Sequence, residues 1–84
     1  MKNKILIKLI VPSLNDEFEI FVPVNERISK VKELLVKSIK DISDSAFDDT
    51  RLYSLLDPDT GTIYDSRLPI RDTNIKNSKK VILF

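Results

Sequence analysis

The sequence predicts an α+β fold in which one helix covers one face of a mixed β-sheet. Residues 25–43 carry apolar side chains at steps of three and four, the spacing of an amphipathic helix. The other apolar residues mostly form short runs rich in Ile, Leu and Val between Pro, Gly, Asn and Asp turn residues, which is typical of strands. At 84 residues the chain has room for one core, so we expect a single domain over residues 1–84.

The composition excludes several classes of function. A net charge of +1, with the two signs interspersed, is not the pattern of a nucleic-acid binder. The chain has no Cys and no His, so it lacks thiolate ligands, the usual general base and the commonest zinc ligand. We therefore expect no enzyme activity, no metal and no cofactor. No run approaches the roughly 20 apolar residues of a membrane span, and a cytoplasmic location is expected.

The first two strands form a predicted hairpin. Residues 5–11 are apolar on both faces and end at Pro12, which indicates a central strand. This strand is favoured over a signal peptide because Lys8 interrupts the apolar run and no small-residue cleavage site follows it. The polar stretch 13–17 supplies the turn, and residues 18–22 form the second strand.

The helix is predicted to begin near Asn25, as the N-cap, and to end near Ser43. Its apolar stripe is Ile28, Val31, Leu35, Ile39 and Ile42. Phe47 is expected to close one end of the core. Residues 51–56 and 62–64 are predicted as two strands around a turn at 57–61, where Gly61 is expected to take a positive φ. An irregular segment, 65–75, and a last strand, 80–84, complete the chain.

The most apolar strands are the first and the last, so we expect them to lie side by side in the middle of the sheet. A right-handed crossover through the helix is compatible with this arrangement. The order ββαββ with one covering helix is the β-grasp arrangement.

Several segments then show a resemblance to the ubiquitin family. Val22, Ile28 and Val31 match the residues that lead into its helix, and the pair Arg51-Leu52 matches the start of its third strand. The segment Asp72-Thr73-Asn74-Ile75, followed by a polar turn and Val81-Ile82-Leu83, is similar to the D-x-N-I signature before the last strand of ubiquitin. The resemblance implies a ubiquitin-like fold over nearly the whole chain.

The sequence ends at Phe84 without the Gly-Gly tail through which ubiquitin and the related sulfur carriers act. Size and tail loss resemble the YukD-like (EsaB-like) group of Gram-positive bacteria, which is associated with type VII secretion. The resemblance implies a noncatalytic protein-interaction module, an accessory or regulatory component of such a system. The alternative is a ubiquitin-like modifier or sulfur-carrier relative whose native chain extends beyond Phe84.

The candidate binding site is the face of the sheet that the helix leaves uncovered. If the helix covers Ile5, Ile7, Leu9, Val11, Phe18, Ile20, Val22, Leu52, Val81 and Leu83, the opposite face carries Leu6, Ile10, Phe21, Tyr53, Ile82 and Phe84. Large exposed apolar surfaces mark interaction sites, so we expect a protein partner, such as a secretion component, or a second copy of the chain. The resemblance to ubiquitin also implies that Tyr53 and Phe84 fall close to two positions of the patch to which ubiquitin receptors bind. The alternative is that this face is not a binding site, because flanking Lys and Glu side chains cover its apolar residues.

Three other groups of charged residues have simpler interpretations. The sequence Asp57-Pro58-Asp59-Thr60-Gly61 lacks the further acidic ligand of a calcium loop and is interpreted as a β-turn. Lys2, Lys4, Lys79 and Lys80 would converge if the terminal strands are neighbours, and are interpreted as a solvated strand end. Asp48 and Asp49 are interpreted as part of an acidic surface loop.

Overall fold

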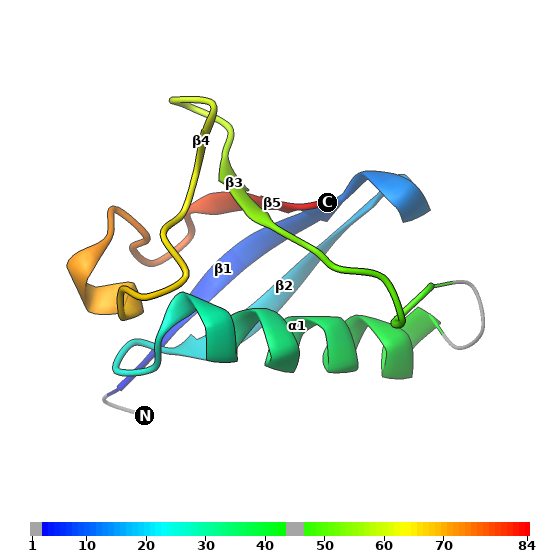
Figure 1. Cartoon of the computed structure of the whole chain (residues 1–84), viewed down its shortest axis with the longest axis horizontal. Helices are drawn as coiled ribbons and strands as arrows, with labels where there is room; N and C mark the ends of the chain where they lie inside the picture. The colour runs from blue at the N-terminus through cyan, green and yellow to red at the C-terminus, as the bar shows by residue number, and fades with distance from the viewer. Residues whose placement is uncertain (1–2, 44–46) are drawn as a thin grey trace.

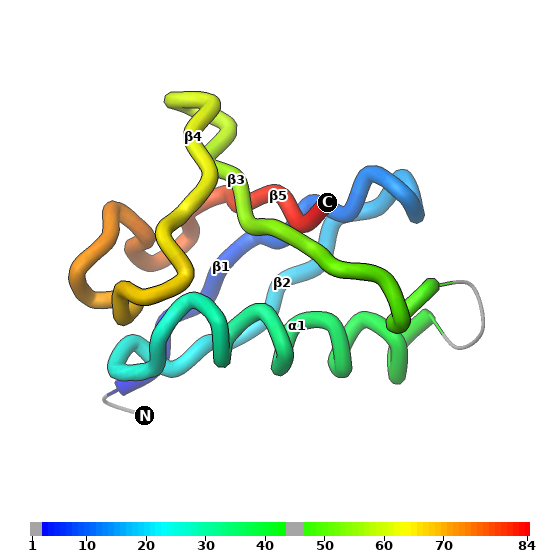
Figure 2. The backbone as a smooth tube through the Cα atoms, viewed as in Figure 1, coloured from blue at the N-terminus to red at the C-terminus, as the bar shows by residue number. Residues whose placement is uncertain are grey.

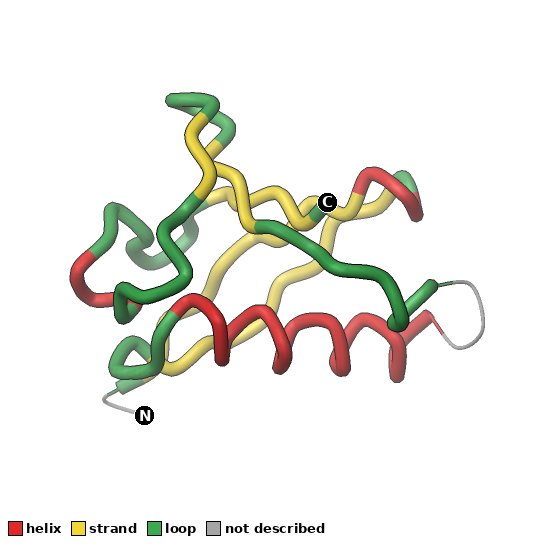
Figure 3. Tube along the Cα trace, in the orientation of Figure 1, coloured by secondary structure: helices red, strands yellow, loops and turns green. Residues whose placement is uncertain are grey.

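The computed structural model describes residues 3–43 and 47–84. In chain order the elements are β1 (Lys4–Val11), the 3-10 helix η1 (Pro12–Leu14), β2 (Asp16–Pro23), α1 (Ile28–Ser43), β3 (Leu55–Asp57), β4 (Thr62–Ile63), the 3-10 helix η3 (Ile70–Asp72) and β5 (Lys80–Leu83). The strands form one mixed sheet in the order β2-β1-β5-β3-β4. Figures 1 and 3 show α1 lying across one face of this sheet, which confirms the predicted β-grasp, α+β arrangement.

The first and last strands occupy the middle of the sheet, as predicted. β1 pairs with β2 in the antiparallel direction over its whole length, and with β5 in the parallel direction. Further hydrogen bonds join β1 to the residues just before β5: the Lys8 N–H donates to the Lys79 carbonyl (2.9 Å), and the Leu6 N–H donates to the side-chain Oδ1 of Asn77 (2.9 Å). These bonds fix the turn before β5 against β1.

The helix begins three residues later than predicted, at Ile28. The Asn25 side chain instead accepts a hydrogen bond from Arg71 Nη1 (2.8 Å). The first amide groups of α1 find their partners in a distant segment, since the Ile28 N–H donates to the Leu68 carbonyl (2.8 Å) and the Ser29 N–H to the Ser66 carbonyl (3.0 Å). The prediction of Asn25 as the N-cap is therefore wrong, because tertiary backbone contacts satisfy the donors that a capping side chain would otherwise serve.

The apolar stripe of α1 fills the space above the centre of the sheet. Four of its five predicted members are fully buried, at Ile28, Val31, Leu35 and Ile39, whereas Ile42, in the last turn, is exposed. They pack against the covered face of the sheet, whose buried residues are Ile7, Leu9, Val11, Val22, Leu55, Val81 and Leu83. Ile5, Phe18 and Ile20, also predicted to lie on this face, are partly buried against the core. Phe47 is buried at 1% exposure and closes the core after the helix, as predicted.

The segment before β3 differs from the prediction in which side chains face inward. Only Leu55–Asp57 form the strand, and residues 47–54 run as irregular backbone alongside α1 (Figures 1 and 2). Leu52, predicted for the core, is 94% exposed, and Tyr53, predicted for the open face, is only 7% exposed. Because successive side chains of an extended chain face opposite sides, placing Tyr53, Leu55 and Asp57 inward turns Leu52 outward. Both predictions are therefore wrong.

The connection from β3 to β5 matches its predicted outline. Gly61 has φ +71° in the turn between β3 and β4, as expected for the one glycine of the chain. In the irregular segment that follows, Ile70 and Ile75 are buried, but Leu68 is exposed. The Ile70 N–H donates to the Glu26 carbonyl (3.0 Å) and the Arg71 N–H to the Val24 carbonyl (2.9 Å), so this segment pairs with the residues that precede α1.

Candidate protein-binding surface

The open face of the sheet carries one continuous apolar row that crosses four strands. Pairing places Ile10 opposite Ile82, Ile82 opposite Leu56, and Leu56 opposite Ile63. Directly paired residues point to the same face of a sheet, so these four side chains lie in line across β1, β5, β3 and β4. Ile63, on the edge strand, is 56% exposed, and the other three are partly buried.

Phe84 extends this row along β5. It lies two residues beyond Ile82 and therefore points to the same face. The backbone of Phe84 exchanges two hydrogen bonds with Ser54, 2.8 and 3.0 Å long, which fixes its position beside the segment that leads into β3. Its side chain is 42% exposed. We define the apolar patch as Ile10, Leu56, Ile63, Ile82 and Phe84.

Charged residues separate this patch from two of the other three predicted site residues, Leu6 and Phe21. Lys8 lies opposite Glu19 on one side and opposite Lys80 on the other, which forms a charged row next to the apolar row. Leu6 and Phe21 pair with each other beyond that row, and Phe21 is 56% exposed. Five of the six predicted site residues therefore lie in two apolar areas on the same face, with Ile10, Ile82 and Phe84 in the larger one.

Tyr53 is not part of either area. Its ring stacks on Phe47 with centroids 4.9 Å apart, and its hydroxyl donates to the Asp48 carbonyl (2.5 Å). Leu56 and Ile63 take part instead, and the sequence prediction missed both. Reading residues 53, 55 and 57 as the inward set would have placed Leu56 on the open face, but that reading requires an aspartate, Asp57, to be buried.

A polar network makes the burial of Asp57 possible. The Lys79 ammonium donates to Asp57 Oδ1 (2.8 Å) and also to the Asp59 carboxylate, while Asn74 Nδ2 donates to Asp57 Oδ2 (2.6 Å). The Tyr64 hydroxyl donates to Asn74 Oδ1 (2.7 Å). A buried carboxylate is stable only when it is paired and hydrogen-bonded, so this network permits the inward register of β3.

The network also shifts the proton affinities of its members. Hydrogen bonds from Lys79, and to a smaller extent from Asn74, hold the pKa of Asp57 well below its usual range. The hydrogen bonds that Lys79 donates to the carboxylates of Asp57 and Asp59 raise the pKa of Lys79. Burial raises the pKa of Tyr64 to about 12. Because the two carboxylates of the turn at 57–61 bind an ammonium group from the protein itself, their geometry favours a structural role, as the interpretation as a β-turn predicts.

The predicted lysine cluster is not assembled as expected. The parallel pairing places Lys80 opposite Lys8, four residues along β1 from Lys4, and Lys79 turns towards Asp57. Lys2 lies outside the described residues. Within residues 3–43 and 47–84, no group of three or more His, Cys, Asp or Glu side chains could hold a metal ion. None of the helices in this described part is long and apolar enough to cross a membrane.

The fold is that of ubiquitin-like proteins, and the comparison with solved structures shows this directly. A chain of the MycP5-free ESX-5 inner membrane complex superimposes with a TM-score of 0.78 at 9% identity, covering 98% of this chain and 21% of that chain. The EccD5 ubiquitin-like domain from Mycobacterium xenopi gives a TM-score of 0.77 at 13% identity, with 96% of this chain and 92% of that chain covered. This chain thus spans about a fifth of the length of the first of these and nearly all of the second.

The same fold is also found in a different assembly. A chain of a toluene 4-monooxygenase HD complex superimposes with a TM-score of 0.78 at 6% identity, covering 95% of each chain. No protein-family model and no curated protein sequence matches this chain. At such low identities the likeness shows the fold alone.

Proposed function

We propose that this chain is a noncatalytic protein-interaction module of a type VII secretion system of the YukD-like kind, which acts in the cytoplasm of a Gram-positive bacterium. The observation that carries the proposal is the apolar patch on the open face of the sheet. Four paired strands present one uninterrupted apolar row, and the exposed side chains of Ile63 and Phe84 lie at its margins. Contiguous apolar surface with charged residues beside it is typical of protein-binding sites.

The likeness to an EccD5 ubiquitin-like domain and to a chain of an ESX-5 inner membrane complex supports the choice of system. Both likenesses extend over nearly the whole of this chain. The partner in this proposal is a protein component of the secretion machinery. It binds through apolar contacts with the patch, and the charged row of Lys8, Glu19 and Lys80 sets its orientation.

Affinity capture tests the proposal. The tagged chain is expressed in the bacterium that encodes it, membranes are solubilised in a mild detergent, and the retained proteins are identified by mass spectrometry. We expect the wild-type chain to retain a type VII secretion component and Ile63→Lys to lose it. Ile42→Lys is the matched control, since it places the same change on an exposed isoleucine of α1, away from the sheet.

The two parts of the proposal fail separately. If the wild-type chain retains no secretion component, the assignment to this system is wrong. If Ile63→Lys retains the partner as well as Ile42→Lys does, the partner does not bind through the patch.

A further inference from the structure

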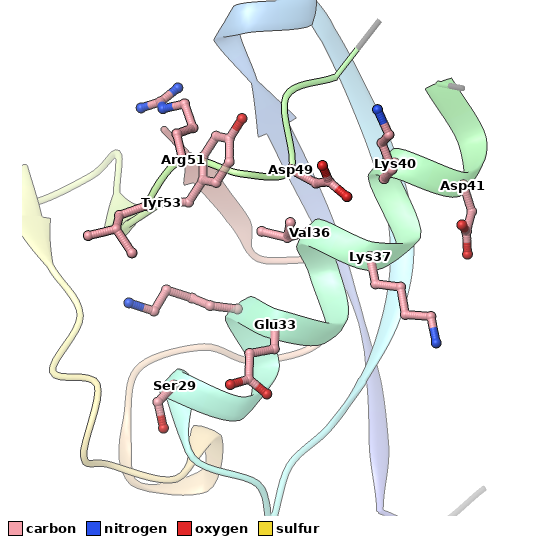
Figure 4. A pocket seen from close by; sticks show the side chains of 11 residues that line it. Ser29, Glu33, Val36, Lys37, Lys40, Asp41, Asp49, Arg51 and Tyr53 are labelled. Atoms are coloured by element: carbon pink, nitrogen blue, oxygen red, sulfur yellow. The ribbon is translucent and has the colours of Figure 1, made fainter. Parts of the chain in front are cut away.

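A second candidate binding site lies on the other side of the molecule, between α1 and residues 49–53. It is a groove of about 700 Å³. Val36 lines it from the helix, and Leu52 and Tyr53 line it from the segment that leads into β3. Figure 4 shows Val36, Asp49 and Tyr53 around the space between the two elements. Leu52 is the most exposed large apolar residue in the described part of the chain.

Within residues 3–43 and 47–84, the backbone beside this groove has an edge without hydrogen-bond partners. The N–H and C=O of Ser54 both bond to Phe84, so they face β5. Peptide groups alternate in direction along an extended chain, and those of Tyr53 and Leu55 therefore face away from β5. The Leu55 carbonyl accepts the Tyr64 N–H (2.9 Å). The N–H and C=O of Tyr53 have no partner among the described residues, because β4 is only two residues long and ends before reaching them.

Such an edge can accept one more strand. An added extended peptide forms backbone hydrogen bonds with the edge, and its alternate side chains enter the neighbouring groove. Here the backbone of Tyr53 supplies the donor and the acceptor, and Val36 and Leu52 supply apolar contacts for the inserted side chains. The charges around the groove specify what kind of peptide would bind.

The side chains that line the groove carry four positive charges and three negative ones, a net charge of +1. Its basic side chains are Lys32, Lys37, Lys40 and Arg51, against the acidic Glu33, Asp41 and Asp49. The Glu33 carboxylate forms an ion pair with Lys30, with Oε2 and Nζ 3.6 Å apart, so part of its negative charge is balanced within the helix. Lys40 Nζ donates to the Phe47 carbonyl, and the Arg51 guanidinium lies 4.3 Å from the centre of the Tyr53 ring, so neither cation is neutralised by its contact. A peptide with negative charge complements this surface.

We propose that the groove between α1 and residues 49–53 binds an extended peptide with a short apolar core and acidic flanks, which adds as a strand beside Tyr53. The apolar patch lies on the open face, whereas the groove lies beside the helix that covers the opposite face. The two sites are therefore separate, and one chain can hold two partners at once.

A synthetic peptide tests this proposal directly. The probe is a fluorescein-labelled decapeptide with four central Val and Ile residues and acidic residues at both ends. Binding to the purified full chain is followed by fluorescence polarisation, and the site is mapped from amide shifts in NMR spectra of the 15N-labelled chain. We expect saturable binding, with the shifts concentrated at residues 32–40 and 49–55.

Two altered peptides separate strand addition from simple apolar contact. N-methylation of alternate central residues removes backbone donors while the side chains remain, and we expect it to weaken binding by about tenfold. Replacing the acidic flanks with lysines is expected to weaken binding, most strongly at low salt. Equal affinity of the N-methylated peptide would refute strand addition, and equal affinity of the lysine-flanked peptide would refute the charge argument.

Protein variants locate the peptide. We expect Leu52→Asp to weaken binding by at least about tenfold, because it places a like charge and a polar group at the apolar margin. Ile63→Asp, on the open face, is expected to bind normally. Loss of binding in Ile63→Asp alone, shifts confined to the open face, or no saturable binding at millimolar peptide would each overturn the proposal. Substitutions of Ile63 test binding at the apolar patch, and substitutions of Leu52 test binding at the groove. Failure of the groove proposal is therefore distinguishable from failure of the proposed function.

Discussion

The adjacent residues Leu52 and Tyr53 give the sharpest test of the structure, because sequence pattern and tertiary structure assign them opposite roles. Tyr53→Ala removes a buried ring that stacks on Phe47 and a hydroxyl that donates to the Asp48 carbonyl. Replacing a buried aromatic residue with alanine costs about 3–5 kcal/mol. A domain of this length is stable by only about 4–13 kcal/mol, so this single change removes a large share of the free energy of unfolding.

Two further variants divide that cost. Tyr53→Phe keeps the stacked ring and removes only the hydroxyl, and its expected cost is about 1 kcal/mol. Leu52→Ala removes a side chain that is almost fully in water, and we expect a change of at most about 0.5 kcal/mol. The measurement is urea unfolding followed by circular dichroism at 222 nm, with the slope of the free energy against urea checked for constancy.

The result that would refute the reasoning is a loss at Leu52 equal to or larger than the loss at Tyr53. That outcome would mean that Leu52 faces the core and Tyr53 the open face, as the sequence predicted, with Leu56 on the same side as Leu52. The open-face row through Leu56 would then be wrong as well, since Leu56 would turn inward.

Two further predictions concern the hairpin of β3 and β4. The pKa of Asp57 is lower in the folded chain than in the unfolded chain, so its contribution to stability is present above about pH 5 and is lost as the pH falls towards 2 and below. We expect the thermal unfolding midpoint to fall over this range, and Asp57→Asn to lower the midpoint at pH 7 and flatten its acid dependence; an unchanged acid slope would contradict the role of the network. Gly61→Ala is expected to cost about 1 kcal/mol, because φ is +71° while the space for a Cβ is open, and Gly61→Asn is expected to cost less; equal stability of all three chains would show that the turn can change its backbone conformation.

The sequence predicted the general architecture because its strongest patterns are local. The stripe of α1 repeats at helical spacing over four turns, and only its last member, Ile42, falls outside the core. The run at residues 5–11 is apolar on both faces, which a strand at the edge of a sheet would not require. These features predicted the central pairing of β1 with β5 and the covering helix without knowledge of any distant contact.

The start of the helix could not be predicted in the same way. Asn25 is a suitable capping residue, but the first amide groups of α1 bond to carbonyls of Ser66 and Leu68, about forty residues later in the chain. A capping motif describes only what neighbouring residues can supply. Once a distant backbone segment satisfies the same donors, the helix can begin at a different residue.

Side chains along an extended chain alternate between its two faces, but the sequence of residues 52–57 does not show which set faces the core. Either set can do so: one is Leu52, Ser54 and Leu56, and the other is Tyr53, Leu55 and Asp57. Each set contains two large apolar residues and one polar residue, so local hydrophobicity does not separate them. Tertiary structure decided between them, because Lys79 and Asn74 satisfy the buried carboxylate of Asp57 and Phe47 stacks on Tyr53. The sequence by itself determined which segments form the sheet and the helix. Which residues form the candidate binding surfaces depended on contacts between side chains that lie far apart in the chain.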